Sequence, residues 1–565
     1  MLEILILWGY MLFVNTAIGL GVLNAFHRLA GKKGGTKAGF APAVLAGVVV
    51  ITVYAETISL FGKVGMAAHL VLLAAACACL WLCRNSALEF GKKLKRICFS
   101  WEGMLYLIFV LITAYFASRG MQHTDTGIYH AQAIRWYEEY GLVKGLGNLQ
   151  QHFAYNSAYL AYAAVFSMKW LTGQSLHATT GFLQAFLCVY ALYGLKKIRQ
   201  HENHGADACR IAVLLYALAN AEGILSPASD FGAMFLVLWI ALLWAQNACE
   251  HKGEDRTESY SLLCVAVVCV TTYKLSAGML VILALYPAVC LIREKQWKRI
   301  ALYLGAGILV LLPWLARNVL LSGWLIYPFG ALDLFDVDWK IPLTYLQHDA
   351  DQIKVWGRCV FDVAQIDMPL SQWLPLWWEA KDRYEQMLLL ANVIAVPLEL
   401  LAVGVQIGKR KKIVWEELIL HAAVIGGLAG WFFLAPFIRY GLAFLLLFPL
   451  LAFGTWMRPM PMGPARILSG FLCAAVFFSL GMYWDYYVLT DIVWAKKYLT
   501  SPAWIVQQDY DRVRVGEIKV DSLTVYYPLD SDNISYHAFP GTAYESMAER
   551  SKMRGSLIED GFMPK

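Results

Sequence analysis

Charged residues are scarce in this chain of 565 residues, at 16% of the total. Hydrophobic residues make up 59%, and the mean hydropathy is +0.52. Average soluble domains carry about 25% charged residues. The composition therefore argues against an ordinary soluble enzyme and favours a protein that crosses a membrane many times.

Cysteine is scarce in the segments that we assign to the external side, where disulfides could form. The chain has twelve cysteines, and all except Cys359 fall in apolar runs or in loops that we assign to the cytoplasm. A single external thiol cannot form a disulfide framework. Cys77, Cys79 and Cys83 share one apolar segment that lacks histidine or acidic partners, so packing is favoured there over metal binding.

Long apolar runs predict an all-α polytopic membrane protein. A helix needs about 20 apolar residues to cross a hydrocarbon core about 30 Å thick. Fourteen candidate spans cover residues 4–24, 40–61, 65–83, 103–118, 178–195, 208–226, 231–247, 259–273, 275–292, 299–316, 387–406, 414–434, 440–456 and 467–489. We therefore expect a bundle of about 14 spans over residues 1–490.

The basic residues predict the orientation of this bundle, because cytoplasmic loops are enriched in lysine and arginine. Alternate loops carry the basic clusters, near residues 28–37, 84–96, 196–199, 293–299, 409–412 and 458–466. The opposite loops hold two polar inserts, 119–177 and 317–386, and the tail from 491 to 565. The net charge of +6 thus follows from topology, and we expect no nucleic-acid partner.

The first insert is expected to contain two helices at the membrane surface. One begins near Thr126 and ends at Gly141, which can adopt the left-handed conformation of a helix C-cap. The other covers 156–172, an apolar stretch that would reverse the loop alternation if it crossed the membrane. We interpret it as a helix that lies in or dips into the outer interface, held by Tyr159, Tyr162 and Trp170.

Ionisable residues gather at the external ends of the spans. Asp125 opens the first insert, and the others occupy short external turns or helix ends, namely Asp230, Lys274, Arg317 and Arg439. Charges near lipid are costly and mark functional sites by default. In a compact bundle, we expect these acids and bases to converge on one face of the membrane.

This order of polar turns resembles the GT-C superfamily, membrane glycosyltransferases that take a sugar from a polyprenyl-phosphate donor. The segments that carry the resemblance are Asp125-Thr126-Gly127-Ile128-Tyr129-His130, Lys274-Leu275-Ser276, Arg317-Asn318 and Asp338-Trp339-Lys340-Ile341-Pro342. These segments resemble those of an uncharacterised bacterial branch of that superfamily. The resemblance covers roughly residues 100–450 and implies a GT-C-like helical bundle, external juxtamembrane helices and inverting sugar transfer.

The resemblance also implies a role for each polar group. Asp125 is the expected general base at the acceptor hydroxyl, and Lys274, Arg317 and Arg439 are expected to bind the donor phosphate. Asp230 matches the second acid of the superfamily, which holds a divalent metal in some members and orients the acceptor in others. If Mg²⁺ or Mn²⁺ is required, Asp125 and Asp230 are its expected ligands. Further donor or acceptor contacts are expected from His130, Tyr129, Asn318 and Tyr440.

The expected activity is sugar transfer on the extracytoplasmic side of the plasma membrane, in cell-envelope glycan assembly. The donor would be a polyprenyl-phosphate-linked sugar, and the acceptor a glycan, a lipid or a protein. Other classes fit the same composition: a lipid-linked glycan polymerase or ligase, a flippase or transporter, or a structural membrane protein. Transport would be favoured by charges at the membrane midplane and by broken helices in repeated halves.

Each candidate residue also has a structural interpretation without catalysis. Asp125 and Asp230 could cap helices, each contributing about 1 kcal/mol. Lys274, Arg317 and Arg439 could extend to lipid headgroups from helix ends.

The tail is expected to form a small external α/β domain. Hydropathy falls from about residue 491, and an alternating run within 513–527 predicts a strand or a hairpin. The tail is long enough to cover the first insert, where it could contact the acceptor.

Overall fold

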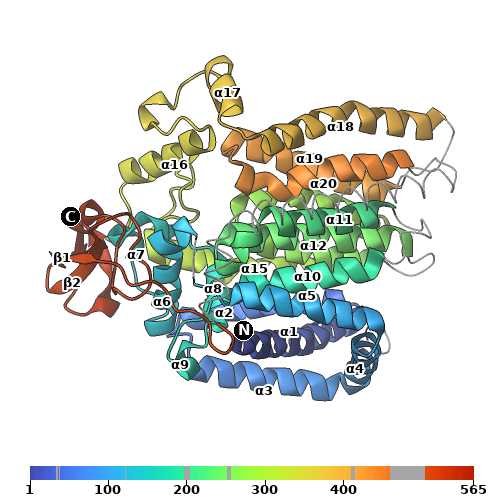
Figure 1. The fold of residues 1–565 in the computed structure, drawn as a ribbon, viewed down its shortest axis with the longest axis horizontal. Helices are drawn as coiled ribbons and strands as arrows, with labels where there is room; N and C mark the ends of the chain where they lie inside the picture. Colours follow the sequence, from blue (N-terminus) through green and yellow to red (C-terminus); the bar gives the residue numbers. More distant parts are fainter. Residues whose placement is uncertain are drawn as a thin grey trace.

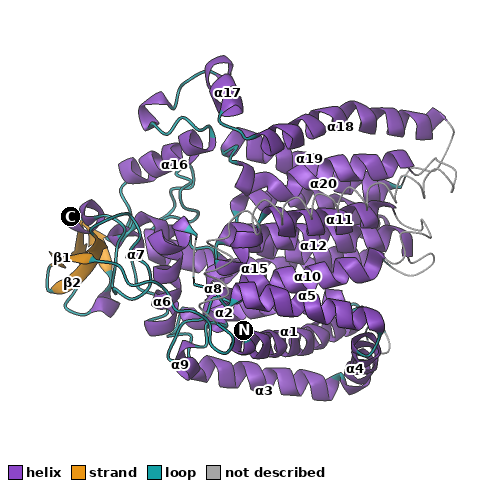
Figure 2. Ribbon diagram, in the orientation of Figure 1, coloured by secondary structure: helices purple, strands orange, loops and turns teal. Residues whose placement is uncertain are grey.

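The computed structural model describes residues 1–32, 36, 38–120, 123–195, 204–250, 256–408, 414–457 and 503–565. Helices dominate, and most run side by side in one bundle (Figures 1 and 2). The inserts and the C-terminal domain lie together at one end, next to the N terminus (Figure 1). Backbone bonds join Leu2 to Trp504 and Glu3 to Ile505 at that end.

Within the described residues, eight helices are long and apolar enough to cross a membrane. They are α1 (Leu2–Leu29), α2 (Phe40–Ser59), α12 (Ser229–Glu250), η5 (Leu275–Ala284) continued by α14 (Leu285–Arg293), α15 (Trp297–Ser322), α18 (Arg383–Gly408), α19 (Trp415–Leu434) and α20 (Ile438–Met457). A ninth arises if α3 (Met66–Leu82) and α4 (Arg84–Cys98), bent by 94°, form one span. The chain is therefore compatible with a multi-pass membrane protein.

The predicted span count of fourteen is not established. Shorter helices occupy four of the predicted spans: α5 (Trp101–Ala117), α10 (Thr179–Leu195), α11 (His204–Ala219) and α13 (Thr257–Tyr273). In the described residues these helices have 16 or 17 residues, at the lower end of the range of about 17–25 for a span, and α10 and α11 adjoin residues that the structure does not describe. The last predicted span, 467–489, lies outside the described residues, as does the expected domain boundary near 490.

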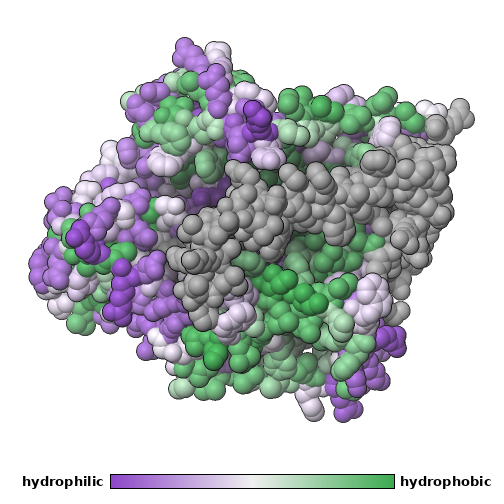
Figure 3. All heavy atoms as spheres, viewed as in Figure 1, coloured by the Kyte–Doolittle hydropathy of each residue, from purple (hydrophilic) through white to green (hydrophobic). Residues whose placement is uncertain are grey.

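In Figure 3, the described residues visible along the bundle are mainly hydrophobic, whereas hydrophilic residues are frequent over the C-terminal domain. The core runs through the bundle around α12. In the apolar 18-residue stretch of α12, 89% is buried. In α15 and α18, at the outside of the bundle, only 33% and 28% of the corresponding stretch is buried, so these helices present apolar side chains to the surroundings. Asp230, in the first turn of α12, therefore lies at the centre of the bundle end that carries the inserts.

The first insert begins as predicted. A π-turn η1 (Thr126–His130) leads into α6 (Ala131–Glu139), and Gly141 has a φ of +84°. Short helices follow: α7 (Leu146–Leu149), η2 (Gln151–Tyr155), α8 (Ala158–Val165) and α9 (Lys169–Thr172).

The prediction of an interfacial helix over 156–172 is wrong for its central part. Helix α8 has eight residues, all of them buried, so it is enclosed by the protein. Of the three expected anchors, only Trp170 is exposed, at 41%. The expected anchors Tyr159 and Tyr162 are 0% exposed. Their hydroxyls bond inside the protein, Tyr159 to Thr180 at 2.7 Å and Tyr162 to Asn15 at 3.1 Å. Alternation of apolar residues could not distinguish a lipid-facing helix from one enclosed by its own bundle.

The second insert starts later than predicted, because α15 continues to Ser322 and ends at Gly323, with a φ of +78°. It contains α16 (Leu343–Gly357), η6 (Val363–Gln365) and α17 (Leu370–Glu379).

The C-terminal domain has two small antiparallel sheets and a short helix. The predicted hairpin is confirmed: β1 (Val515–Val520) pairs with β2 (Leu523–Pro528). Helix α23 (Glu545–Glu549), β3 (Ser551–Met553), η8 (Ile558–Asp560) and β4 (Phe562–Pro564) complete it, and β3 pairs with β4.

The domain packs against the first insert, as expected. The backbone N–H of Phe562 donates to the Lys144 carbonyl at 2.9 Å, and the Tyr536 hydroxyl donates to Glu138 at 2.5 Å. Gly145, with a φ of +64°, lets the chain pass close to β4, since a Cβ there would lie 2.0 Å from the Phe562 carbonyl oxygen.

Candidate active site

Four of the predicted charged residues meet where the first insert joins the bundle. Asp125 lies just before η1, and Asp230 in the first turn of α12. Lys274 ends α13, and Arg439 lies in the first turn of α20. We call these four residues the charged cluster. They come from distant parts of the sequence and converge because each occupies the same end of its helix or insert.

Arg439 is the centre of the cluster. Its Nη2 donates to Asp125 Oδ2 at 2.6 Å, and its Nε lies 2.9 Å from Asp230 Oδ2. Its Nη1 lies 2.7 Å from His123 Nε2. A planar guanidinium can serve several acceptors at fixed angles, which a lysine cannot do. Arg439 therefore holds both carboxylates and one histidine in fixed positions.

Lys274 completes the cluster on the other side of Asp230. Its ammonium group bonds Asp230 Oδ1, so the two oxygens of Asp230 have different cationic partners. The same ammonium lies 3.6 Å from the centre of the Tyr440 ring, a cation–π contact. Lys274 uses one of its three N–H donors on Asp230, and a fifth of its side chain is exposed.

These contacts argue against the interpretation of Asp125 as a helix cap. Asp125 has helical backbone angles, φ −62° and ψ −25°, and its side chain makes no capping bond to η1. Its carboxylate is instead directed to Arg439, and its side chain is 29% exposed. Burial by itself would raise the pKa of this carboxyl, but the Arg439 guanidinium holds the pKa below its usual value. Asp125 is therefore ionised at neutral pH.

Two histidines lie beside the charged cluster. Since His123 Nε2 accepts from Arg439, its proton is assigned to Nδ1. His130 is buried next to Thr126, with 3.4 Å between His130 Nδ1 and the hydroxyl. Burial lowers the pKa of His130 to about 3, so this imidazole is neutral at physiological pH. As a neutral ring, His130 can accept or donate a hydrogen bond but supplies no charge to a phosphate.

A row of aromatic residues leads away from the cluster through the first insert. The Tyr129 ring centre lies 4.1 Å from that of His130 and 5.0 Å from that of His152. Tyr155 follows, with its ring centre 5.5 Å from that of His152. The predicted residue Tyr129 thus lies at the site, whereas sequence reasoning missed His152 and Tyr155. The only feature of the sequence that could have indicated these two residues is the short run of polar and aromatic residues around them, between two apolar segments.

The row ends at Asp349 of α16, which joins the two inserts. Asp349 Oδ1 accepts from Gln151 at 2.9 Å and from the Tyr155 hydroxyl at 3.0 Å. Arg550 of the C-terminal domain bonds the same Gln151 at 2.7 Å. Burial raises the pKa of Asp349 to about 6.

This raised pKa predicts a pH dependence of stability. The folded protein holds the Asp349 proton more tightly than the unfolded chain does. The protonated carboxyl therefore contributes to the free energy of unfolding below about pH 4, and this contribution is lost as the pH rises through about 6. A difference of about 2 pKa units corresponds to about 3 kcal/mol. We expect Asp349→Asn to flatten this part of the curve, measured as apparent melting temperature in detergent from pH 4 to 7. An unchanged slope in this variant would contradict the assignment.

Arg317 and Asn318 do not join the charged cluster, and their expected place there is wrong. Arg317 is 2% exposed inside α15, where its Nη1 donates to Ser59 at 2.6 Å and its Nε to Asn156 at 3.1 Å. Its guanidinium carbon lies 4.2 Å from the centre of the Tyr137 ring. Asn318 Oδ1 accepts from Asn156 at 2.8 Å. Both residues fix the first insert to α15.

The expected metal site does not fit this arrangement. The Arg439 guanidinium contacts both Asp125 and Asp230, in the position that a cation bridging the two carboxylates would need. Among the described residues, no group of three His, Cys, Asp or Glu side chains is placed to hold a metal ion. We therefore assign no step to a metal held by these two acids.

The geometry leaves two reactive positions open. Asp125 Oδ1 has no hydrogen-bond partner among the described residues, and Lys274 retains N–H donors beyond the one on Asp230. The cluster itself is neutral, with two carboxylates and two cations. It can thus offer an ionised acceptor for a hydroxyl proton beside a cationic donor for a phosphate.

Comparison with known proteins gives a family but no activity. Residues 1–446 match the family model described as a domain of unknown function, DUF8201. No curated protein and no solved structure is significantly similar to the chain.

Proposed function

The chain belongs to the DUF8201 family, and we propose that it is a membrane glycosyltransferase of GT-C type. It would transfer a sugar from a polyprenyl-phosphate-linked donor to a glycan, lipid or protein acceptor. The reaction would take place on the external side of the plasma membrane, in cell-envelope glycan assembly.

The observation that carries this proposal is the charged cluster at the insert end of an apolar bundle. Asp125 and Lys274 present unused acceptor and donor positions, while Arg439 fixes the surrounding carboxylates. Sugar transfer from a phosphate needs these two functions close together, because a proton leaves the acceptor as negative charge develops on the leaving phosphate.

The roles that we assign follow from these contacts. Asp125 Oδ1 accepts the proton of the acceptor hydroxyl, and that hydroxyl oxygen attacks the anomeric carbon. The bond to the phosphate oxygen breaks, and the resulting anion is stabilised by Lys274. Arg439 positions Asp125 through its contacts with Asp125, Asp230 and His123, and the remaining N–H groups of its guanidinium can donate to the phosphate, the role predicted for this residue. Asp230 pairs with Lys274 and so holds its amino group in position.

The proposal is tested by measuring transfer with the purified full-length chain in detergent. Radiolabelled sugars are offered either on polyprenyl phosphate or on a nucleotide, with membrane extracts as the source of acceptor. We expect labelled product from the lipid-linked donor only. Transfer from the nucleotide sugar, or no product from any lipid-linked donor, would contradict the proposal. A ladder of products would instead indicate a polymerase.

One observation favours transport as a second candidate. Glu56 of α2 is 1% exposed, and within the described residues neither of its carboxylate oxygens has a hydrogen-bond partner. Buried acids inside spans are typical of ion-coupled transporters. Movement of lipid-linked sugar across vesicles without any labelled product would support this candidate over the transferase.

A further inference from the structure

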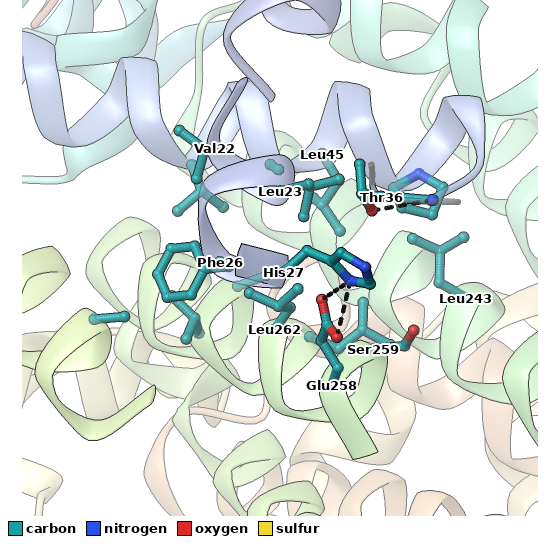
Figure 4. Close-up of a pocket in the computed structure, with 18 of the residues that line it drawn as sticks. Val22, Leu23, Phe26, His27, Thr36, Leu45, Leu243, Glu258, Ser259 and Leu262 are labelled. Atoms are coloured by element: carbon teal, nitrogen blue, oxygen red, sulfur yellow. Dashed lines mark hydrogen bonds and ion pairs between the residues drawn. The ribbon is translucent and has the colours of Figure 1, made fainter. Parts of the chain in front are cut away.

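Paired charges form a polar level at the end of the bundle opposite to the charged cluster. His27 Nδ1 lies 3.2 Å from Glu258 Oε1, as the dashed lines of Figure 4 show, and Lys32 Nζ lies 2.7 Å from Glu258 Oε2. These three residues line a cavity of about 960 Å³ whose wall is otherwise mainly apolar. The ion pairs therefore mark where the apolar part of the bundle ends on this side.

Helix α13 connects this polar level to the charged cluster. Glu258 lies in its first turn, and Lys274 directly follows its last residue, sixteen positions later. No Asp, Glu, Lys or Arg occurs between these two residues. At 1.5 Å per residue the separation is about 24 Å, close to a hydrocarbon core about 30 Å thick. In a bundle that spans the membrane, the charged cluster therefore lies near the membrane surface at the insert end.

Helix α17 of the second insert lies at the level of the charged cluster. Trp377 Nε1 donates to the Pro436 carbonyl at 2.7 Å, and the Trp373 ring centre lies 5.7 Å from that of Phe432. Pro436 is three residues before Arg439 in the turn that leads into α20. In Figure 1, α17 lies beside the end of α18 that is nearest to the inserts. The two tryptophans thus fix α17 next to the turn that carries Arg439.

Helix α17 is amphipathic, and the bundle covers only the middle of its apolar face. Trp373 and Trp377 form this middle and are 6% and 3% exposed. Leu370 and Leu376 lie at its two margins, because they are three residues before and three residues after Trp373. These leucines are 50% and 48% exposed. The opposite face carries exposed polar residues, namely Ser371, Gln372 and Glu379.

The exposed leucines of α17 continue the apolar surface of α18. Helix α18 begins four positions after α17 ends, and only 28% of its apolar stretch is buried. Tyr384 and Met387, in its first two turns, are 76% and 67% exposed. Tyrosine and tryptophan are enriched where a membrane meets water. An amphipathic helix at this level, with its polar face in water, is typical of a helix in the headgroup layer.

We propose that α17 lies in the headgroup layer of the leaflet nearest to the inserts. Leu370 and Leu376 contact the acyl chains of this leaflet, and Gln372 faces water. The partner is the bilayer surface and not another protein, because the exposed leucines are continuous with the lipid-facing side of α18. Lipids of this leaflet therefore border the turn that carries Arg439.

Photo-crosslinking of the full-length chain in nanodiscs tests this proposal. Benzoylphenylalanine is introduced in place of Leu376 or Leu370, and the discs contain radiolabelled phosphatidylcholine. Leu400 of α18, which is 69% exposed in the middle of a span, is replaced in the same way as a lipid-facing reference. We expect both α17 positions to capture labelled lipid with a yield within about twofold of this reference.

The matched control is Gln372, which is exposed on the opposite face of the same helix. Its yield should be about tenfold lower, as should that of Leu529, which is 55% exposed in the C-terminal domain. All five positions are exposed, and melting temperatures equal to that of the unmodified protein confirm that the variants fold. Equal yields at Leu376 and Gln372, whether both are high or both are low, would overturn the proposal. Low yields at both leucines would also overturn it.

Discussion

Replacing Asp125 with asparagine is expected to lower the rate of sugar transfer by about 10²- to 10⁴-fold, the usual contribution of a general base. Asparagine keeps the shape of the side chain but cannot accept the proton of an acceptor hydroxyl. Arg439 retains Asp230 and His123 as partners, so the fold should survive. The measurement is the initial rate of transfer from a radiolabelled lipid-linked donor.

A matched acid outside the charged cluster provides the control. Asp333 of the second insert also pairs with a lysine, Lys340, but is 54% exposed and far from Asp125 in the sequence. Asp333→Asn should leave transfer unchanged. Donor binding by the Asp125→Asn variant should also persist, because Lys274 is intact. Full activity in Asp125→Asn would remove Asp125 from the mechanism and favour Asp230 as the base.

Replacing Arg439 with glutamine is expected to destabilise the protein by about 1.5–3 kcal/mol, the usual net contribution of hydrogen bonds to charged groups. Asp230 is only 8% exposed and would keep Lys274 alone as its cation. Asp125 would lose its ion-pair partner, and its pKa would rise because burial would no longer be opposed by the guanidinium. The acid limb of the pH–rate profile should then move to higher pH.

One further variant separates charge from geometry at position 439, and a second serves as a surface control. Arg439→Lys keeps the charge but cannot contact Asp125, Asp230 and His123 together, so it should recover stability only in part. Arg514→Gln removes an arginine whose ion pair with Asp530 is fully on the surface, and no measurable change in melting temperature is expected. Equal melting temperatures for Arg439→Gln and Arg514→Gln would contradict the central role of Arg439.

Much of the charged cluster could be predicted because membrane topology restricts where charges can lie. Asp125, Asp230, Lys274 and Arg439 all stand at helix ends on the side opposite to the basic loops. Helix ends on one side of a bundle converge when the helices pack side by side. The sequence could not tell which residue pairs with which, because the rotation of each helix about its axis depends on packing with its neighbours.

Arg317 and Asn318 show the limit of this reasoning. They stand at the predicted end of a span, but α15 continues for more than one further turn, to Ser322. Their side chains are therefore directed between helices, where Ser59 and Asn156 bind them. The row from Tyr129 to Asp349 was equally hidden, because it brings together two inserts that are separated by many helices in the sequence.

By itself, the sequence determined the helical character of the chain, the positions of its long apolar helices and the hairpin of its tail. These properties depend on local apolar runs and alternation, which act over a few residues. Only the tertiary structure decided that α8 is enclosed and that Arg439 joins two acids. Each of these depends on contacts between residues far apart in the chain, and local sequence patterns do not specify such contacts.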